Sequence, residues 1–503
     1  MCQVIRRWYQ DLTSPYRFRW VFCQLDALQH CFPPNLRQYL DELPETLDET
    51  YERILKGINK AQKDNAHRLL QCLTVAVRPL LVEELAELLA FDFTASSGGL
   101  PTLKEDWRWD DQEQAILSTC SSLITIIPRD DSRVVQFSHF SVKEFLTSSR
   151  LARSPQGDIS RFRIDLEPAH TLMAQACMAT LLRLDEDTSS SGAKVSPLVK
   201  YAAQHWVDHA QFEDVSSCVR EGMDDLFDSS KPYFAAWLRV HDIDEDWTSF
   251  SPSQDGVGSP LYYAAFCGFY DVAERLIMKQ PEQVNARGGR IVAPLPAALY
   301  KKHFDVANLL YKHGSVVDVQ GSYKYTPLHI ASLQDKLDIM RWLLNHGADA
   351  NSRSQSHYTP LSEAAGAHHL EAVQVLLEHN ADINWQSISG ETPLCGAFEG
   401  DGSNAVLVIR RLLEHGADPN ICKHDHPTPL HKASSRGWLE AARLLLSYGA
   451  KVDEKDGRGW TPLQAATVNE HEDIAKLLIE HRAVTLASAV SLAVSDSEPC
   501  SEP

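Results

Sequence analysis

A short motif of the form Thr-Pro-Leu-x recurs seven times in the second half of this 503-residue chain. Its copies begin at Ser259, Ala293, Thr326, Thr359, Thr392, Thr428 and Thr461. The prolines step by 34, 33, 33, 33, 36 and 33 residues. A regular step of this size indicates a solenoid of stacked units, each of which buries its apolar face against its neighbours. Such arrays offer a long surface and rarely perform chemistry, so the motif favours a binding protein.

One unit shows why the pattern folds into two helices. Thr326 can cap an orphan amide of the first helical turn, and Pro327 follows at the position where its missing N–H costs nothing. Residues 337–344 place apolar side chains at helical spacing. Gly347 ends the second helix, because it adopts the left-handed conformation that a helix C-terminus needs. Asn380 replaces this glycine in the next unit and is the next best residue there.

This pattern resembles the ankyrin repeat over about residues 253–482, with about seven units. The resemblance implies a loop and two antiparallel helices per unit, stacked into a curved array. Two units depart from the pattern. Residues 293–296 (Ala-Pro-Leu-Pro) lack the capping hydroxyl, and residues 399–404 form an insert that should lengthen a loop between two helices. The last unit ends at residues 481–483 without the glycine, as a capping repeat would.

Composition narrows the partner classes. The chain has 48 basic and 68 acidic residues and a formal net charge of −20, which disfavours general binding to phosphate backbones. Its 11 cysteines include no Cys-x-x-Cys pair, so neither a zinc ribbon nor a disulfide scaffold is indicated. No apolar run approaches the ~20 residues of a membrane helix. We therefore expect a cytoplasmic protein that binds neither nucleic acid nor membrane.

The N-terminal half has a different pattern. Residues 43–55 and 78–89 open amphipathic helices, and the β-rich runs 123–127 and 133–137 flank a polar turn. Helices followed by a hairpin predict a winged-helix domain over residues 41–150. DNA reading is disfavoured, since a helix carrying Glu83, Glu84 and Glu87 would be repelled by a major groove. The fold class expected is mostly α: a small α+β winged-helix domain, a helical connector at 151–250, and the solenoid.

Four segments give a second resemblance: residues 18–28 (Phe-Arg-Trp-Val-Phe-Cys-Gln-Leu-Asp-Ala-Leu), 43–44, 78–80 and 137–142. They look like the stretch that follows the nucleotide-binding core in fungal NACHT–ankyrin proteins of the STAND signalling class. That resemblance implies a remnant of the post-NACHT helical region at 1–40. In the class, a NACHT module hydrolyses a nucleoside triphosphate and the C-terminal repeats sense a ligand. The chain would then be the sensor or regulatory arm. Separately, residues 483–503 form a short polar tail rich in serine, which we expect to be disordered.

The phosphate-binding loop of such a module is missing. No Gly-x-x-x-x-Gly-Lys-Ser/Thr sequence occurs, and cradling phosphates needs those backbone amides and that lysine. We expect no cofactor and no enzymatic activity. The chain is either a motorless adaptor, able to oligomerise through a NACHT-containing partner, or the end of a longer NTPase. A ubiquitin-ligase adaptor would need a recruitment motif, and we find none.

Other chemical sites are poorly supported. There is no Gly-x-Ser-x-Gly elbow, and His471 and Glu472 lack the second histidine of a zinc protease. The pair His424 and His426 around Asp425 lacks further ligands, so we expect no metal. His139 lies at a strand-to-helix junction and is expected to be buried or to cap the helix. No catalytic, cofactor or metal residue is predicted.

A partner surface is the better-supported site. By resemblance, the variable positions of an ankyrin unit are the loop tip and the exposed start of the first helix. Aromatic side chains there are favoured as contact anchors, although each can instead pack against the adjacent loop. Carried onto this chain, the positions include Tyr323, Tyr325, Leu333, Gln334, Tyr358, Ile388, Glu391, His424, Asp425, Arg436, Arg458 and Trp460.

We predict that alanine at Tyr323, Tyr325, Tyr358 and Trp460 together lowers the affinity for the protein partner, because aromatic anchors bury large areas. Titration of the partner against the quadruple variant measures this. An unchanged affinity would show that these side chains serve only the packing of the loops.

Overall fold

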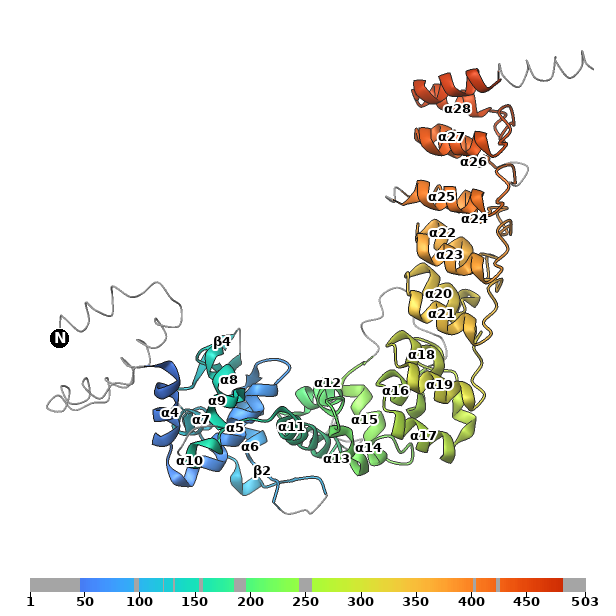
Figure 1. Cartoon of the computed structure of the whole chain (residues 1–503). Coiled ribbons are helices and arrows are strands. Elements are labelled where there is room, and N and C mark those ends of the chain that lie inside the picture. The colour runs from blue at the N-terminus through green and yellow to red at the C-terminus, as the bar shows by residue number, and fades with distance from the viewer. Residues whose placement is uncertain are drawn as a thin grey trace, which may run out of the picture. The chain divides into compact units, whose positions relative to one another are not determined.

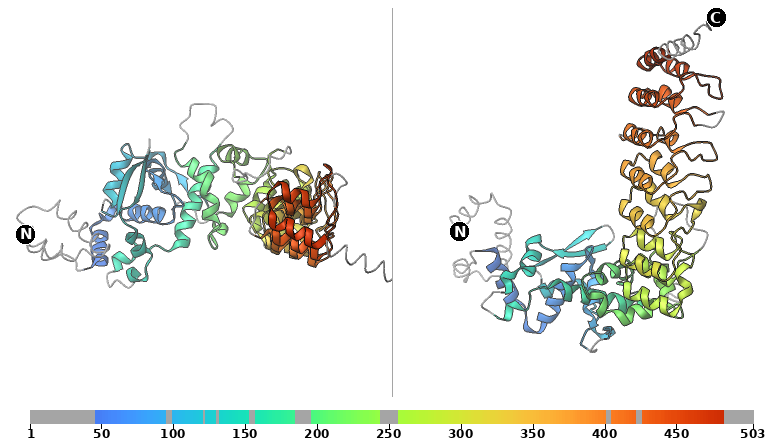
Figure 2. Two further views of the ribbon diagram at one scale, coloured as in Figure 1. Left: turned by 90° about the horizontal axis from the view of Figure 1, so that it is seen from above. Right: turned by 45° about the vertical axis from the view of Figure 1, so that its right-hand side comes forward.

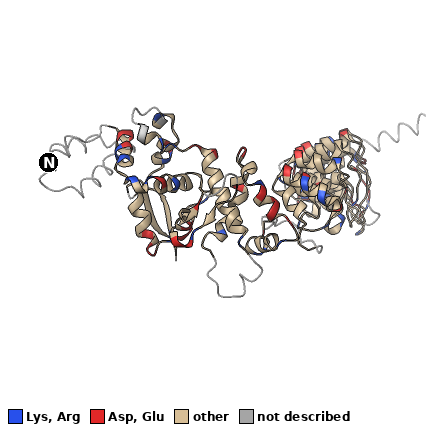
Figure 3. Cartoon of the chain, turned by 90° about the horizontal axis from the view of Figure 1, so that it is seen from below, with Lys and Arg blue, Asp and Glu red and all other residues tan. Residues whose placement is uncertain are grey.

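The computed structural model describes residues 46–94, 99–120, 122–129, 132–152, 157–184, 196–243, 256–400, 404–421 and 426–482. The chain forms two compact units, Met1–Asp246 and Trp247–Pro503 (Figure 1). Acidic and basic side chains are intermixed on the helices of both units (Figure 3). Over the described residues, no helix combines the length and the apolar character that crossing a membrane requires.

Several predicted features fall outside the described residues. They are the stretch at 18–28, the Leu43 and Pro44 pair, the proposed remnant at 1–40, the loop residues His424 and Asp425, and the tail at 483–503. What the sequence predicts for these residues therefore stays a prediction.

The first unit contains a winged-helix domain. Strands β4 (Ile124–Arg129) and β5 (Ser132–Phe137) form the predicted antiparallel hairpin, and β1 (Leu80–Leu81) pairs with β5 on its other side. The sheet order is therefore β1-β5-β4. Strand β1 was missed in the sequence because its two leucines continue the apolar pattern of the helix that follows. Three helices complete the domain: α5 (Lys63–Val75), α6 (Val82–Leu89) and α7 (Gln112–Cys120).

Shorter elements surround this domain. Helix α4 precedes it, with Thr46 accepting from the Glu49 amide at 3.2 Å as its sequence spacing predicts. His139 caps α8 through the Ser141 amide, which confirms its structural role. The elements are α4 (Leu47–Gly57), η2 (Lys60–Gln62), β2 (Phe91–Asp92), β3 (Thr102–Leu103), η3 (Glu105–Trp107), α8 (Phe140–Thr147), α9 (Ser149–Ala152) and α10 (Gly157–Ser160).

The helical region belongs to the same unit. Helix α11 packs against both α12 and α5, and the Val77 amide donates to the Tyr201 hydroxyl at 3.2 Å. Trp206 and Trp237 are fully buried, and the Trp237 indole donates to the Ala203 carbonyl at 3.0 Å. The predicted helices of this region are thus present. They are α11 (Leu166–Leu181), α12 (Val199–Ala210), α13 (Val215–Cys218), α14 (Arg220–Leu226) and α15 (Tyr233–Val240).

Helix α6 exposes fewer acidic side chains than the sequence predicts. Two of the three glutamates expected on the outside of α6 are buried: Glu84 is 1% exposed and Glu87 is 2% exposed. Glu84 receives two hydrogen bonds from Arg78, at 2.6 and 2.8 Å, and Glu87 receives one from Arg108 at 2.8 Å. Periodicity alone could not reveal this, because the arginine partners lie outside the helix. These side chains hold the domain together and say nothing about DNA.

The second unit is a stack of helix pairs (Figure 2). In each pair an inner helix begins at the proline of the motif and an outer helix follows it. The pairs are α16 (Pro260–Phe266) with α17 (Tyr270–Lys279), α18 (Pro294–Tyr300) with α19 (Phe304–Lys312), α20 (Pro327–Leu333) with α21 (Leu337–Asn345), α22 (Pro360–Gly366) with α23 (Leu370–Glu378), α24 (Pro393–Gly396) with α25 (Ala405–Glu414), α26 (Pro429–Arg436) with α27 (Leu439–Ser447), and α28 (Pro462–Val468) with residues 472–482. Short 3₁₀ turns η4 (Pro281–Asn285) and η5 (Ser322–Lys324) lie in the loops.

The helix ends follow the sequence prediction. Thr359, Thr392, Thr428 and Thr461 each accept from the amide three residues on, as does Ser259. Left-handed residues end five outer helices: Gly314, Gly347, Asn380, Gly416 and Gly449. The two units that depart from the repeat pattern in sequence also differ in structure. Ala293 provides no side-chain cap, and α24, which precedes the insert, is only four residues long.

Asparagine side chains link the loops of successive repeats. Asn420 donates to the Gly449 carbonyl at 3.1 Å and accepts from the Lys451 amide at 2.8 Å. Asn285, Asn351 and Asn384 make the same pair of bonds. Asp318 occupies the second of these five positions, between Asn285 and Asn351. One of its oxygens accepts from the Asp349 amide at 3.0 Å, while the other is buried without a partner.

We predict that Asp318→Asn strengthens this junction by about 1 kcal/mol at pH 7, because the amide restores the missing donor. Burial raises the pKa of Asp318. The junction of the natural protein should therefore gain stability as the pH falls through that raised pKa, and the gain should be complete below about 3.9, the unfolded value. The variant should lack this gain.

Hydrogen exchange of residues 316–351 in the full chain measures the opening free energy of the junction. Asn384→Asp makes the reverse change in an intact link and should weaken its own junction. Equal protection of natural protein and Asp318→Asn at pH 7 would contradict the prediction.

Candidate protein-binding site

In the second unit, a side-chain hydrogen bond between a loop and an inner helix recurs between successive repeats. It joins the residue just before one motif to the second residue after the leucine of the next motif. The Tyr325 hydroxyl donates to Glu363 at 2.6 Å, and the Lys432 ammonium donates to Glu391 at 3.1 Å. Tyr358 would face Gly396, which has no side chain, and donates to Glu391 instead at 2.9 Å. We call these five side chains the polar ladder.

Charges in the polar ladder are balanced locally. Lys432 also reaches Glu399, in the insert, at 2.7 Å. Burial alone would lower the pKa of Lys432, but Glu399 and Glu391 outweigh it and raise that pKa. Burial likewise opposes ionisation of Glu391, yet Lys432 and Tyr358 lower its pKa. Both groups are therefore held in their charged forms at neutral pH.

The other end of the polar ladder is less charged. Burial raises the pKa of Glu363, although the hydrogen bond from Tyr325 opposes the shift. Burial, followed by the bond to Glu363, raises the pKa of the Tyr325 hydroxyl. Tyr325 and Tyr358 are both half-buried. Their hydroxyls thus serve the packing of the repeats, while parts of their rings stay accessible.

Two loop tips carry exposed apolar side chains. Tyr323 and Ile388 are each 60% exposed. The tips are joined by backbone hydrogen bonds, from the Gln355 amide to the Tyr323 carbonyl at 2.7 Å and from the Ile388 amide to the Ser356 carbonyl at 3.1 Å. The array therefore presents bulky apolar groups to solvent on supports fixed to one another.

The remaining predicted residues vary in exposure. Arg436 and Arg458 are exposed, whereas Leu333, Gln334 and Trp460 are half-buried. Arg436 donates to the Gly400 carbonyl at 3.0 Å, so the insert also engages it. With Tyr323, Tyr325, Tyr358, Ile388 and Glu391 these positions recur from repeat to repeat. Their role in binding a partner stays a prediction.

Sequence reasoning missed three contributors. Glu363 and Lys432 complete the polar ladder, and a fixed offset from each motif could have identified them. Trp385 is the third: its indole donates to the His357 carbonyl at 2.8 Å, and the Arg353 guanidinium lies 3.7 Å from its ring centroid. Nothing in the motif marks this cation–π pair, because it depends on how two neighbouring loops stack.

Two histidines bridge successive repeats. His329 Nδ1 accepts from the Thr326 amide at 3.2 Å, so its Nε2 carries the proton and donates to the Tyr358 carbonyl at 2.9 Å. His431 does the same, with its Nε2 2.8 Å from the Trp460 carbonyl. Burial lowers the pKa of His329 to about 4 and lowers that of His431. Both rings are neutral, and each fixes the loop that carries a predicted contact residue.

Among the described residues, no group of three His, Cys, Asp or Glu side chains lies close enough together to bind a metal ion. Of the histidine cluster noted in the sequence, only His426 is described.

Comparison with known proteins agrees with this geometry. The family model "Ankyrin repeats (3 copies)" matches residues 261–354, 295–387, 336–421 and 401–487. The model "GPI inositol-deacylase, winged helix domain" matches residues 51–157. The chain thus carries an ankyrin-repeat solenoid preceded by a helical region and a small winged-helix domain. Ankyrin repeats bind other proteins, which makes this face a protein-binding candidate.

Relatives cover the chain only in part. "Azaphilone pigments biosynthesis cluster protein L" of Monascus ruber is 32% identical over 303 residues, which is 56% of this chain and 62% of that protein. "ARF GTPase-activating protein Git" of Drosophila melanogaster is 45% identical over 79 residues, 16% of this chain and 11% of that protein. "Ankyrin repeat and SOCS box protein 16" of Homo sapiens is 42% identical over 74 residues, 14% and 16% respectively.

Among solved structures, the ankyrin repeat domain of Bcl-3 is similar, with a TM-score of 0.40 and 28% sequence identity. The match covers 44% of this chain and 97% of that one.

We predict that acidification weakens the junction that His329 bridges. Its folded pKa of about 4 lies below the usual histidine pKa of about 6.5, so the stability that its bridge contributes is complete above the unfolded pKa and is lost as the pH falls toward 4. The loss should be on the order of 2 kcal/mol. Hydrogen exchange of the loop at 352–358 between pH 7 and pH 4 measures it.

His329→Gln provides the matched comparison. Gln464 shows that glutamine can accept from the capping residue's amide, here at 2.9 Å from Thr461. The variant should lose about 1 kcal/mol at pH 7 with the bridge, yet depend less on pH. The exposed His379→Gln should keep the natural pH dependence. A natural protein whose protection is flat from pH 7 to pH 4 would refute the argument.

Proposed function

We propose that this chain is a protein-recognition arm of a NACHT-type signalling protein, or a motorless adaptor derived from one, and not itself an enzyme. A protein ligand docks on the loop tips and inner helices of the ankyrin repeats. The helical region transmits the event to the winged helix. The chain acts in the cytoplasm and can assemble into oligomers through a NACHT-containing partner.

The observation that carries recognition is the pair of exposed apolar side chains at the loop tips. Tyr323 and Ile388 expose their apolar side chains to solvent. Backbone hydrogen bonds between neighbouring loops hold the backbone at both positions in place. Exposed, rigidly supported aromatic and aliphatic groups are typical anchors of protein interfaces. The signalling role rests on the resemblance to post-NACHT sequences and on the match to a winged-helix family model.

The alternative is that these residues form the end of a longer nucleotide-hydrolysing NACHT NTPase. It would share the same recognition surface but would add a phosphate site. An in-frame Gly-x-x-x-x-Gly-Lys-Ser/Thr sequence upstream in the gene would favour it.

Recognition is tested by affinity capture with the full chain, followed by titration of the captured protein. We expect Tyr323→Ala with Ile388→Ala to weaken binding at least about tenfold, because both anchors are removed. Met278→Ala is the matched control, since this side chain is 68% exposed on the outer helix α17. Equal losses in the double variant and the control would refute binding at the tips.

The absence of nucleotide chemistry is tested separately by calorimetry. We expect no saturable heat when ATP or GTP with Mg²⁺ is titrated into residues 1–503. Saturable binding would show that the chain holds a phosphate site without the usual loop and would overturn the non-enzymatic assignment.

A further inference from the structure

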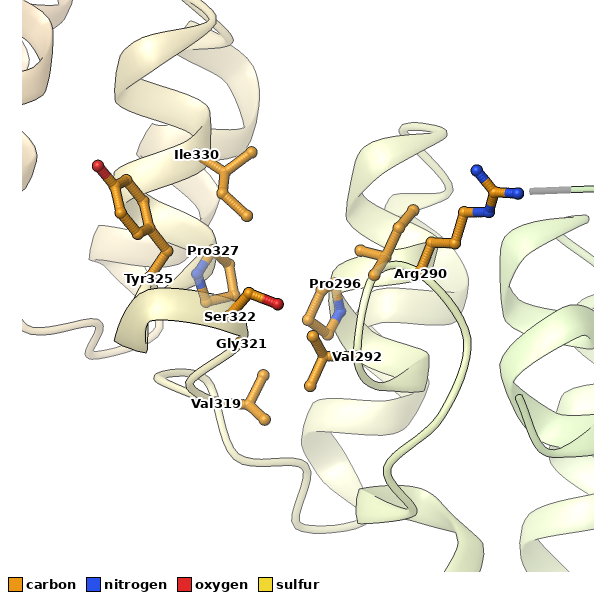
Figure 4. Close-up of a pocket in the computed structure, with 10 residues that line it drawn as sticks. Arg290, Val292, Pro296, Val319, Gly321, Ser322, Tyr325, Pro327 and Ile330 are labelled. Carbon is orange, nitrogen blue, oxygen red and sulfur yellow. The ribbon is translucent and has the colours of Figure 1, made fainter. Parts of the chain in front are cut away.

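An apolar hollow lies between the second and third repeats, one junction before the polar ladder begins (Figure 4). The empty space between its walls is about 420 Å³ when the part open to solvent is included, so the hollow is not an enclosed cavity. Val292 and Pro296 of the second repeat face Pro327 and Ile330 of the third across it, with Val319 below (Figure 4). An open apolar hollow of this kind can receive one side chain of a partner protein.

The hollow follows from the residues at three positions. Val292 and Ile330 occupy the two positions that carry Tyr325 and Glu363 at the next junction, so an apolar pair replaces a hydrogen-bonded one. Pro296 stands where His329 stands one repeat later and cannot bridge to the next loop. The inner side of the junction thus lacks the side-chain bridge that closes the next one.

Helix spacing at this junction is wider than at its neighbours. Among the described helices, inner helix α18 approaches α20 less closely than it approaches α16, and less closely than α20 approaches α22. The outer helices α19 and α21 are likewise less close to each other than α17 is to α19 or α21 is to α23. Long side chains span the outer part of the gap: Trp342 donates to Asn308 at 3.0 Å and Lys302 to Asp338 at 3.1 Å. The inner part is left open as the hollow.

Backbone strain is concentrated at the same place. Val292 has φ of 76°, in the left-handed region that β-branched residues rarely adopt. Backbone strain of this kind is commonly found where a ligand is held. Here it places an apolar side chain, 8% exposed, in the wall of the hollow.

Charge identifies the partner. Residues 287–324 contain six Lys or Arg and two Asp or Glu, in a chain whose acidic residues outnumber its basic ones by 68 to 48. Arg290 lies at the edge of the hollow, Lys324 is exposed beside Tyr325, and Arg287 reaches the Gln320 carbonyl at 3.0 Å. An acidic segment would be attracted to this edge and repelled by most of the remaining surface.

We propose that the hollow receives one bulky apolar side chain of an acidic peptide segment of the partner, with flanking Asp or Glu residues near Arg290 and Lys324. This inference rests on the proposed function, because it specifies the chemistry of the protein that the repeats recognise. The hollow supplies the anchor site, and the basic edge supplies the selection for acidic sequences.

The test selects random 12-residue peptides displayed on phage against the full chain and measures the best peptide by fluorescence polarisation. We expect peptides rich in Asp and Glu around a single Leu, Phe or Trp. Ile330→Asp should weaken binding at least about tenfold and Arg290→Glu about three- to tenfold. Lys451→Glu, which makes the same charge change at a side chain 66% exposed in a distant repeat, should have no effect.

Val292→Gly is a second variant, in case Ile330→Asp fails to fold. It should fold, because glycine relieves the left-handed strain, and it should weaken binding at least about threefold, because it removes part of the wall of the hollow. Enrichment of neutral or basic peptides, or of none, overturns the proposal. So does an acidic peptide that binds Ile330→Asp normally but fails with Tyr323→Ala and Ile388→Ala. That last result would keep recognition at the loop tips while refuting the hollow.

Discussion

Stacking of one repeat on the next is the interaction on which the second unit depends. Most inner helices have seven or eight residues, too few to be stable alone in water. Their motif leucines, such as Leu328, Leu361 and Leu430, are 0% exposed. That burial requires the neighbouring repeat. The polar ladder, the asparagine links and the histidine bridges can form only once this apolar contact has set the spacing between units.

Local features of this fold could be predicted from the sequence, because each is determined by residues that are close together in the chain. The threonine caps, the left-handed residues at Gly347 and Asn380, and the hairpin of the wing all have short-range causes. Features that join distant residues could not. Lys432 meets Glu391 from 41 positions away, and the arginines that pair with Glu84 and Glu87 lie outside their helix.

The candidate site shows the same division. The positions predicted to face a partner follow from the resemblance to the ankyrin repeat, and the structure shows that Tyr323 and Ile388 are exposed there. Their surroundings could not be predicted, since the hydrogen bonds of Tyr325 and Tyr358 depend on which side chain the next repeat offers. Pro296 was recognised as a departure from the pattern. Only the structure shows that the resulting gap opens on the inner side, beside Arg290.

The hydrogen bonds of Tyr325 and Tyr358 have a consequence for the kinetics of binding. Each hydroxyl is held by a glutamate, so each ring already sits in one rotamer before a partner arrives. A partner that packs on these rings loses little side-chain entropy, at a point where a mobile aromatic would cost about 0.5–1.5 kcal/mol. Encounter should therefore resemble rigid docking, with selectivity among partners expressed mainly in how slowly each one leaves.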